Sequence, residues 1–204
     1  MLENLSLLFP FLFLWIVFLY LGLHFRIFPN TIVDILSPLF FYPSLPLTFL
    51  SRYPHYWTYM TPNVLLGGMP IQFLSHPQLL RSFGVGGIIN CCAEVTSPSS
   101  LYTHLDIQWL DLPTRDHCEP SISDIKKALL FIQQMHSQNS KVYIHCKAGH
   151  GRSAAIVFCY LKTILYPNWT MSKVQMFMNS QRKVRTSLYT QKNINTICNS
   201  EKNQ

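Results

Sequence analysis

Charged residues are scarce in this 204-residue chain, and acidic residues are the scarcest of them. Asp and Glu together number nine against 16 Lys and Arg, and charged residues make up 12% of the sequence, about half of the roughly 25% that is usual. Disordered chains combine high charge with low hydrophobicity, so a sequence that is 49% hydrophobic excludes that class. The net charge of +7 favours an anionic partner, either a membrane surface or a nucleic acid.

Metal-binding spacing is also missing. None of the six cysteines is separated from another as in a C-x-x-C motif, so a zinc site has no support and we expect neither a metal nor a cofactor. The sequence shows no internal repeat and no low-complexity tract. These absences leave a globular body whose chemistry, if any, is carried by its own side chains.

The shortage of charge is concentrated near the N-terminus. Residues 5–23 contain no charged residue, and about 20 apolar residues span the bilayer core as a helix. The run has neither the positive start nor the small-residue cleavage site of a secretory signal. We therefore predict a transmembrane helix in an anchor over residues 1–24, with a buried soluble helix as the alternative. The remaining chain carries a net +8, which favours a cytoplasmic or matrix location for it.

A second apolar segment, over residues 25–59, is rich in proline. Three prolines, Pro38, Pro43 and Pro46, interrupt any long helix there. We predict an interfacial or re-entrant segment against the bilayer rather than a second span. The Tyr and Trp residues over 53–59 suit either the headgroup layer or ordinary packing onto the next domain.

Residues 60–200 alternate predicted strands with predicted helices. The strands are expected over 63–70, 84–92, 107–112 and 141–146, and the helices over 76–83, 122–137, 153–165 and 170–181. Ser121 or Ser123 is expected to cap the second helix and Thr170 the last. This alternation predicts an α/β domain with a mostly parallel central sheet flanked by helices.

The candidate chemistry lies in the run HCKAGHGRS over residues 145–153. A loop between a strand and a helix aims backbone N–H groups into one concavity, and the helix N-terminus adds positive potential. Such a nest binds a phosphate dianion and lowers the pKa of Cys146. Arg152 offers a planar fork to two phosphate oxygens, and Ser153 can donate a hydrogen bond to the thiolate.

The C-x-x-x-x-x-R-S run after VYIH resembles the signature loop of the cysteine-dependent protein tyrosine and dual-specificity phosphatases. HCKAG, together with LPTRD (112–116) and PSSLY (98–102), resembles the mitochondrial-type phosphatidylglycerophosphate phosphatases, in particular their plant-like members. The resemblance implies a dual-specificity-phosphatase fold and a cysteinyl-phosphate intermediate. Two departures concern the substrate: NCCAEV (90–95) is closer to the general dual-specificity pattern, and His150 stands where those lipid phosphatases usually carry Arg.

The resemblance also implies roles for single residues. It places the general acid about 30 residues before the cysteine, at Asp116 in the LPTRD run, with Asp111 as a lesser alternative. The catalytic residues are then Cys146, Arg152, Asp116 and Ser153. The substrate-binding loop comprises Lys147, Ala148, Gly149, His150, Gly151 and Arg152, and its supports are His145 and Asn90. A basic cluster at Arg182, Lys183 and Arg185 is expected to contact membrane phosphates or to form a solvated face.

These features together predict a membrane-anchored phosphatase that acts on a phospholipid headgroup, either phosphatidylglycerophosphate or a phosphoinositide. A membrane-tethered protein tyrosine or dual-specificity protein phosphatase is the alternative, and a catalytically dead phosphate-binding adaptor is the third hypothesis. The expected partners are an anionic phospholipid or phosphoprotein and a membrane, whereas no motif supports nucleic acid. The apolar run predicts a single-pass protein. A thiolate nucleophile needs a reducing compartment, so we predict that the catalytic domain faces the cytoplasm or the mitochondrial matrix.

Overall fold

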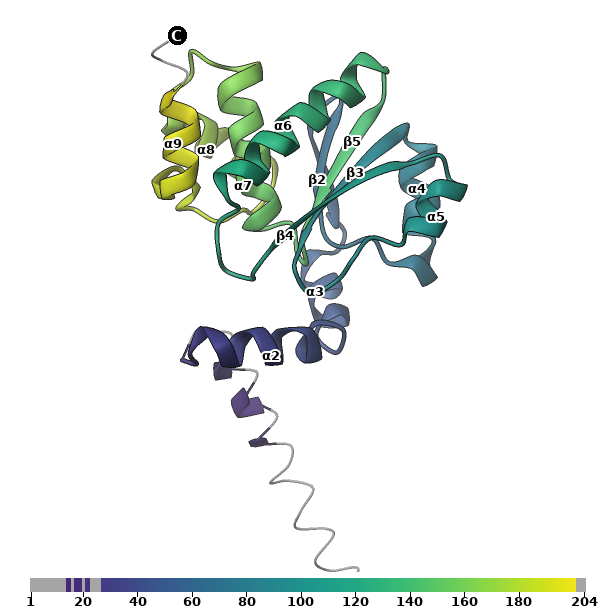
Figure 1. Ribbon diagram of the computed structural model, residues 1–204, viewed down its shortest axis with the longest axis vertical. Coiled ribbons are helices and arrows are strands. Elements are labelled where there is room, and N and C mark those ends of the chain that lie inside the picture. The colour runs from purple at the N-terminus through teal and green to yellow at the C-terminus, as the bar shows by residue number, and fades with distance from the viewer. Residues whose placement is uncertain (1–13, 16, 20, 23–26, 201–204) are drawn as a thin grey trace, which may run out of the picture. The chain divides into compact units, whose positions relative to one another are not determined.

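The structure, a computed structural model, describes residues 14–15, 17–19, 21–22 and 27–200 (Figure 1). The described residues up to Leu45 form one compact unit, and those from Pro46 onward form a second. The transmembrane helix predicted over 5–23 falls mostly outside the described residues.

The first unit is helical over most of its described residues. Helix α2 runs from Asn30 to Phe41 with Pro38 inside it, so this proline does not interrupt the helix as the sequence analysis expected. Helix α3 (Leu45–Arg52) begins after a break that contains Pro43. Among the described residues no single helix is long and apolar enough to cross a membrane, although Thr31–Phe41 and Leu45–Arg52 pass that test together as a bent pair.

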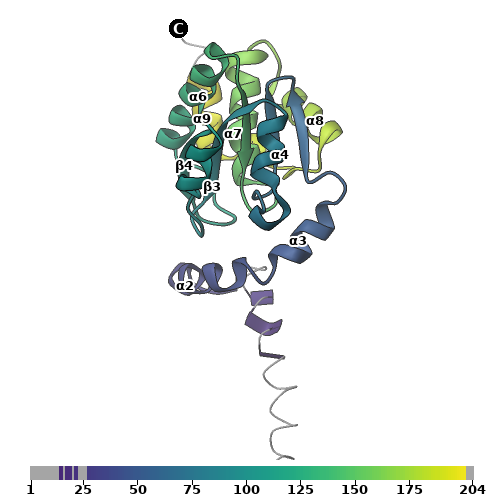
Figure 2. The same ribbon diagram turned by 90° about the vertical axis from the view of Figure 1, so that its right-hand side faces the viewer.

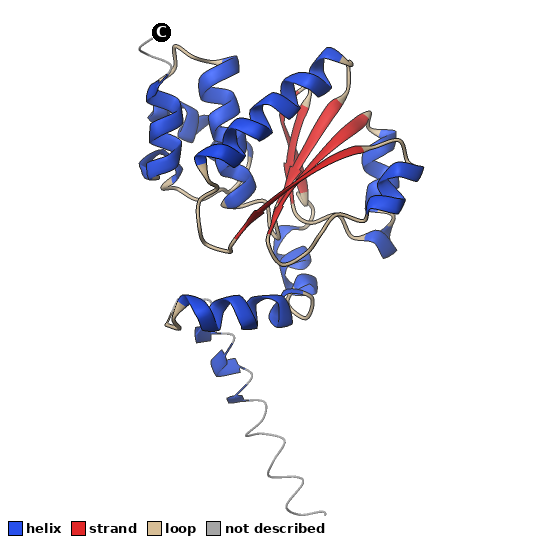
Figure 3. Cartoon of the chain, in the orientation of Figure 1, coloured by secondary structure: helices blue, strands red, loops and turns tan. Residues whose placement is uncertain are grey.

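The second unit is built on a five-stranded sheet, drawn in red in Figure 3, with the order β1-β2-β5-β3-β4. Strand β1 (Trp57–Thr61) is antiparallel to β2 (Val64–Gly67). Strands β2, β5 (Lys141–His145), β3 (Val85–Cys92) and β4 (Gln108–Thr114) are parallel to one another. Parallel strands are covered on both faces, and every residue of β2 and β3 is accordingly buried. The predicted mostly parallel sheet is therefore confirmed.

Helices cover both faces of this sheet (Figures 1 and 2). Helices α4 (His76–Ser82) and α5 (Ser99–His104) lie on one face. On the other face, α6 (Ile122–Ser137) and α7 (Arg152–Tyr160) pack against the strands. The short helices α8 (Met171–Gln181) and α9 (Lys192–Ser200) pack beside α7 and complete the layer. Because α7 is apolar around most of its circumference, this central position buries all nine of its residues.

Two predicted helix starts are confirmed in atomic detail. The Ser121 hydroxyl accepts the N–H of Asp124 at the start of α6, and the Thr170 hydroxyl accepts the N–H of Lys173 at the start of α8 (Met171–Gln181). These caps satisfy N–H groups that have no partner inside the helix. The helix predicted over 153–165 instead ends in a π-helical turn at Leu161–Leu165.

The strand β1 and the helices α5 and α9 (Lys192–Ser200) are among the elements that were not predicted. Strand β1 was not predicted because its aromatic residues are equally consistent with a position in the lipid headgroup layer. Tyr56 is buried, and the Trp57 ring contacts those of His76 at 5.0 Å and Phe83 at 6.2 Å. Ordinary packing onto the following domain therefore accounts for these two side chains.

The sheet register determines where the candidate chemistry gathers. The carboxyl ends of parallel strands meet at one edge of a sheet. Here His145 of β5 pairs with Asn90 of β3, and Cys92 of β3 pairs with Thr114 of β4. The three segments that follow these strands, which begin near residues 93, 115 and 146, therefore lie side by side.

Candidate active site

The loop that joins β5 to α7 is shaped by glycine. Gly149 has a φ of +65°, and a Cβ at this position would lie 2.6 Å from the backbone of Gly67. Only glycine meets both the left-handed conformation and this close approach. Gly151 precedes α7, and no side chain caps that helix. No side-chain cap therefore occupies the first N–H groups of this helix, and the sequence analysis predicts that they bind an anion.

Cys146 is a buried thiol at the start of this loop. The Ser153 hydroxyl donates a hydrogen bond to its Sγ over 3.2 Å. Burial alone would raise the pKa of Cys146, but the charge of Arg152, the Ser153 hydroxyl, and the N–H groups of Ser153 and His150 outweigh it. The pKa falls to about 7. A substantial thiolate fraction at neutral pH makes Cys146 a competent nucleophile.

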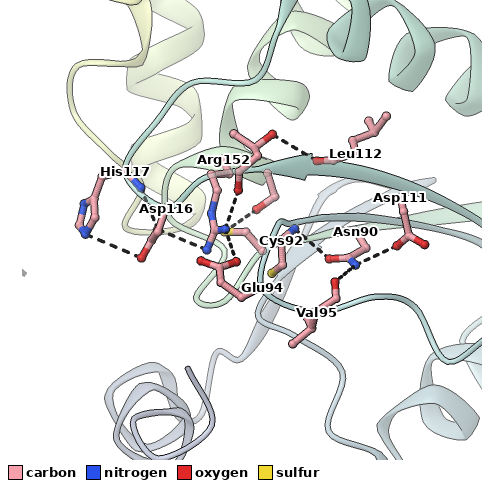
Figure 4. Close-up of polar contacts among 12 residues, drawn as sticks. Asn90, Cys92, Glu94, Val95, Asp111, Leu112, Asp116, His117 and Arg152 are labelled. Atoms are coloured by element: carbon pink, nitrogen blue, oxygen red, sulfur yellow. Dashed lines mark hydrogen bonds and ion pairs between the residues drawn. The ribbon is translucent and has the colours of Figure 1, made fainter. Parts of the chain in front are cut away.

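Arg152 is held by hydrogen bonds through one nitrogen, Nη1, and by an ion pair through another, Nη2. Its side chain is 2% exposed, and Nη1 donates to Glu94 Oε2 at 2.7 Å and to the Thr114 carbonyl at 2.8 Å. Nη2 lies 3.2 Å from Asp116 Oδ1, an ion pair rather than an aligned hydrogen bond (Figure 4). Buried Nε and Nη2 have no hydrogen-bond partner among the described residues. This open edge matches two oxygens of a phosphate.

Glu94 is a functional residue that the sequence analysis missed. Its carboxylate is almost fully buried and forms the 2.7 Å contact that orients the Arg152 guanidinium. An acidic residue in the segment directly after a buried strand was the available signal, and NCCAEV contains it. Its pairing with Arg152, 58 residues further along the chain, appears only in three dimensions.

Asp116 lies in the segment after β4, beside the open edge of Arg152. It is 39% exposed, and its Oδ1 accepts the N–H of His117 at 2.9 Å. Burial raises the pKa of Asp116, but Arg152, His117 and Lys147 act in the opposite direction, and the pKa falls below its ordinary value. The carboxylate is therefore ionised in this state, and it lies where the sequence analysis expected the general acid.

Asp111, the lesser alternative for the acid, is engaged elsewhere. Its Oδ1 accepts a hydrogen bond from Asn90 at 2.9 Å and another from Ser97 at 2.7 Å. The structure thus pairs Asp116, and not Asp111, with Arg152.

Asn90 braces the segment that carries Glu94. Its amide donates to the Val95 carbonyl at 2.8 Å as well as to Asp111, and its Oδ1 accepts the N–H of Cys92 at 2.9 Å (Figure 4). These contacts close a tight turn after β3. The geometry thus connects Asn90 to Arg152 through Glu94, whereas the sequence analysis expected a support for the loop at 146–152 itself.

His145 is buried at the end of β5, with its ring stacked on Tyr143 at a centroid distance of 5.8 Å. Burial lowers the pKa of His145 to about 3, so the ring is neutral. The Cys146 backbone lies close enough to oppose this shift, but neither ring nitrogen has a hydrogen bond of good geometry within the described chain. The expected support is therefore packing in this structure.

The other loop residues form the wall of the site. Lys147 is half-buried, and its pKa is lowered because the effect of burial outweighs the opposite effect of the carboxylates of Asp116 and Glu94. His150 is half-buried with Nδ1 3.2 Å from the Lys183 carbonyl. Ala148 contributes its carbonyl to a further arginine. Across the described ranges, no three His, Cys, Asp or Glu side chains come together as a metal site requires.

That further arginine is Arg182, which was expected at a membrane or solvated face. It is instead 5% exposed. Its Nε donates to the Gly149 carbonyl at 3.2 Å, and Nη2 donates to the carbonyls of Ala148 at 3.0 Å and Tyr56 at 3.2 Å. Nη1 donates to the His55 carbonyl at 2.6 Å. Arg182 therefore clasps the loop to the segment before β1.

Comparisons with known proteins agree with this geometry. Residues 72–199 match the family described as dual specificity phosphatase, catalytic domain. Phosphatidylglycerophosphate phosphatase PTPMT2 of Arabidopsis thaliana is 40% identical over 129 residues, which are 59% of this chain and 55% of that protein. Phosphatidylglycerophosphatase and protein-tyrosine phosphatase 1 of Homo sapiens is 32% identical over 138 residues, 62% of this chain and 68% of that protein.

A solved structure shows the same fold. The crystal structure of PTPMT1 superimposes with a TM-score of 0.60 at 22% identity, covering 73% of this chain and all of that one. The chain belongs to the dual-specificity phosphatase family and carries the catalytic domain of a cysteine-dependent phosphoric monoester hydrolase. Within the family it resembles the phosphatidylglycerophosphate phosphatases, and it spans about half the length of the Arabidopsis relatives, 55% of PTPMT2 and 43% of PTPMT1.

Proposed function

We propose that the protein hydrolyses a phosphomonoester on a phospholipid headgroup through a cysteinyl-phosphate intermediate. The observation that carries the proposal is the pairing of a low-pKa Cys146 with the open edge of Arg152, whose buried Nε and Nη2 have no hydrogen-bond partner among the described residues. Nucleophile and oxyanion cradle then come from one loop, which fixes their separation before substrate arrives.

In the first step, the Cys146 thiolate attacks phosphorus in line with the ester oxygen. The S–P bond forms as the P–O bond to the alcohol breaks, and Arg152 with the loop N–H groups stabilises the equatorial oxygens. Asp116 protonates the leaving alkoxide. It is ionised in the empty site, and a phosphate dianion placed on Arg152 raises the carboxyl pKa because like charges disfavour ionisation.

In the second step, water attacks the phosphorus of the cysteinyl phosphate. The Asp116 carboxylate takes the proton of that water, and inorganic phosphate leaves as the S–P bond breaks. The electron pair returns to Sγ, where the hydrogen bond from Ser153 stabilises the thiolate. The enzyme is thereby restored with no net change in its protonation.

Three observations support a lipid substrate and a membrane setting. Two Arabidopsis relatives are phosphatidylglycerophosphate phosphatases. The chain after residue 23 carries a net +8, and residues 5–23 form an uncharged apolar run. We therefore propose a single-pass anchor over residues 1–24, a membrane-proximal segment over 25–59 and a catalytic domain over 60–200. A reducing compartment agrees with six free cysteines in the described chain.

A protein substrate is the second candidate, because the human relative is also a protein-tyrosine phosphatase. A side-by-side assay separates the two. The full chain is given vesicles containing phosphatidylglycerophosphate, vesicles containing phosphoinositides, and phosphotyrosine peptides, with the Cys146→Ser protein as the blank. We expect kcat/KM for one of the lipids to exceed that for the peptides by at least about tenfold.

Two results contradict the proposal in different ways. A preference for the peptides would assign the site to proteins. Cleavage of a generic aryl phosphate by Cys146→Ser at the wild-type rate would show that Cys146 is not the nucleophile, and the proposed mechanism would then be wrong for every substrate.

A further inference from the structure

Arg52 and the ring of His150 converge beside the signature loop on a single carbonyl oxygen. Arg52, the last residue of α3, donates from Nη1 to the Lys183 carbonyl over 3.0 Å. His150 of the loop places Nδ1 3.2 Å from the same oxygen. Arg52 thus lies beside the loop although it is outside residues 72–199, which match the family.

Arg185 contacts the same part of the loop. Its backbone N–H donates to the His150 carbonyl at 2.9 Å. Its guanidinium lies against Gly151, since a Cβ there would be 3.3 Å from Nη2, and Nη1 donates to the His117 carbonyl at 3.3 Å. Arg185 therefore extends from His150 to the residue next to the proposed general acid.

The cationic groups of Arg52, Lys183 and Arg185 have no carboxylate partner in the part of the chain that the structure describes. Their charges are felt by His150, whose pKa is lowered by burial and then by Arg52, Arg185 and Lys183. Gathered unpaired cations repel one another, so a bound anion lowers the energy of the group.

We propose that Arg52 and Arg185, with Lys183 at the rim, form a second anion site next to the phosphate loop. It binds a second phosphate-type anion while Arg152 holds the phosphate to be cleaved. The inference rests on the proposed function, because the substrate there carries such a group: a glycerol joins the phosphodiester of phosphatidylglycerophosphate to its terminal phosphate. A neighbouring anionic lipid offers the same chemistry.

The second site explains how one catalytic loop can select among phosphomonoesters. Arg152 and the loop N–H groups bind the phosphate dianion itself. They therefore cannot discriminate between phosphomonoesters of different alcohols. A phosphotyrosine presents a neutral ring beyond its ester oxygen, whereas a lipid headgroup with a phosphodiester presents another charge. Arg52 and Arg185 strengthen binding only of a substrate that carries a second anion, which makes them specificity-determining residues.

The test compares two soluble substrates that differ in the second anion. Deacylated phosphatidylglycerophosphate carries a phosphodiester and a terminal phosphate, whereas glycerol 3-phosphate carries the terminal phosphate alone. The ratio of their kcat/KM values is measured for the full chain and for Arg52→Gln, Arg185→Gln and Arg52→Lys. Lys126→Gln, an exposed residue of α6, is the charge-matched control.

We expect the wild-type protein to favour the substrate with two anions. Each Arg→Gln change should lower the ratio roughly tenfold or more, mainly through KM, because one charge-assisted hydrogen bond is lost. Arg52→Lys should retain part of the preference, and Lys126→Gln should retain all of it. An unchanged thermal unfolding midpoint shows that each variant has kept its fold.

A second arm identifies the source of the anion. Phosphatidylglycerophosphate is diluted into neutral vesicles with or without phosphatidylserine. If the arginine variants keep the soluble ratio but lose stimulation by phosphatidylserine, the site binds a neighbouring lipid.

An unchanged ratio together with unchanged stimulation overturns the second site. If wild-type protein still cleaves the lipid vesicles in that case, the proposed function stands. A wild-type preference for phosphotyrosine peptides instead overturns the proposed function and, with it, the lipid source of the second anion.

Discussion

The guanidinium of Arg152 is hydrogen-bonded by the protein along one edge, whereas its other edge carries an ion pair with Asp116 and no hydrogen bond. Nη1 is fixed by Glu94 and Thr114, whereas Nε and Nη2 have no hydrogen-bond partner in the described part of the chain. A buried N–H without a partner is destabilising in the empty protein. Binding of phosphate oxygens removes that penalty, so part of the affinity for substrate originates in the resting structure.

The hydrogen bond from Ser153 is expected to help keep Cys146 ionised, and a variant at Ser153 tests this role. Ser153→Ala removes the hydrogen bond to Sγ at 3.2 Å, so the pKa of Cys146 should rise above its value of about 7. Alkylation by iodoacetamide, which needs the thiolate, should then require a higher pH, and turnover at neutral pH should fall roughly tenfold. Ser121→Ala is the matched control, because it removes the cap of α6 and should leave the alkylation midpoint unchanged. An unmoved midpoint in Ser153→Ala would contradict the role assigned to this hydroxyl.

The role of Asp116 as general acid can be tested by comparing substrates whose leaving groups differ in their need for a proton. Asp116→Asn should slow hydrolysis of alkyl phosphates by about 10²–10⁴-fold, because an alkoxide needs a proton to depart. p-Nitrophenolate leaves without one, so p-nitrophenyl phosphate should lose much less. Steady-state kinetics of both substrates measure the difference. Asp111→Asn is the matched variant, and a leaving-group-dependent loss there instead would make Asp111 the acid.

The roles of single residues were predictable from the sequence where the residues that act together lie close together along the chain. Cys146, Arg152 and Ser153 fall within eight consecutive positions, and strand, loop and helix propensities fix their arrangement. Glu94 and Arg182 reach the loop from 58 and 33 positions away. Spacing along the chain carries no information about such contacts, so their roles emerged only from the fold.

At the scale of elements, the active site is an edge of the sheet rather than a single loop. Strands β3, β4 and β5 end together and present Glu94, Asp116 and Cys146. The strands β3 and β5 were predictable because buried parallel strands are nearly continuous apolar runs. Strand β4 was predicted as well, although it is partly exposed and carries Gln108 and Asp111. The sequence did not predict β1, an edge strand with three partly exposed aromatic or polar residues at its start, or α9, whose composition is largely polar.

The hydrogen bonds by which Arg182 connects the loop to the segment before β1 are expected to stabilise the fold. Arg182→Ala leaves several buried carbonyl groups without their donor, so the free energy of unfolding should fall by about 3 kcal/mol or more. Denaturant unfolding measures this change. Gln181→Ala alters the exposed neighbour and should change stability by no more than about 0.5 kcal/mol. Equal stability of the two variants would show that the clasp contributes nothing.

At the scale of the whole molecule, an apolar N-terminal segment is joined to a basic catalytic unit. The net charge of +7 and the uncharged run over 5–23 predict two modes of membrane attachment that differ in their response to salt. Electrostatic attachment weakens as the Debye length shortens. A spanning helix is held by apolar burial and resists salt.

This difference gives a prediction for the full chain. Protein expressed in membranes should remain in the pellet after washing with about 1 M salt, where screening is nearly complete. Replacing Leu14 and Phe18 with Lys should release it, because each charge costs roughly 2.5–3.5 kcal/mol at the centre of a span. The matched double variant Leu14→Ala, Phe18→Ala should stay bound. Release of the unmodified chain by salt alone would contradict the anchor.

The clasp made by Arg182 also has a consequence for biosynthesis. It joins the loop to His55 and Tyr56, which precede it by 127 and 126 positions, and contacts of such long range form late because their loop-closure entropy must be met first. On the ribosome, Cys146 is made well before Arg182. A nascent chain therefore carries its nucleophile without the clasp that shapes the loop around it. The hydrogen bonds that hold the carbonyls of Ala148 and Gly149 therefore form only after this C-terminal arginine has been synthesised.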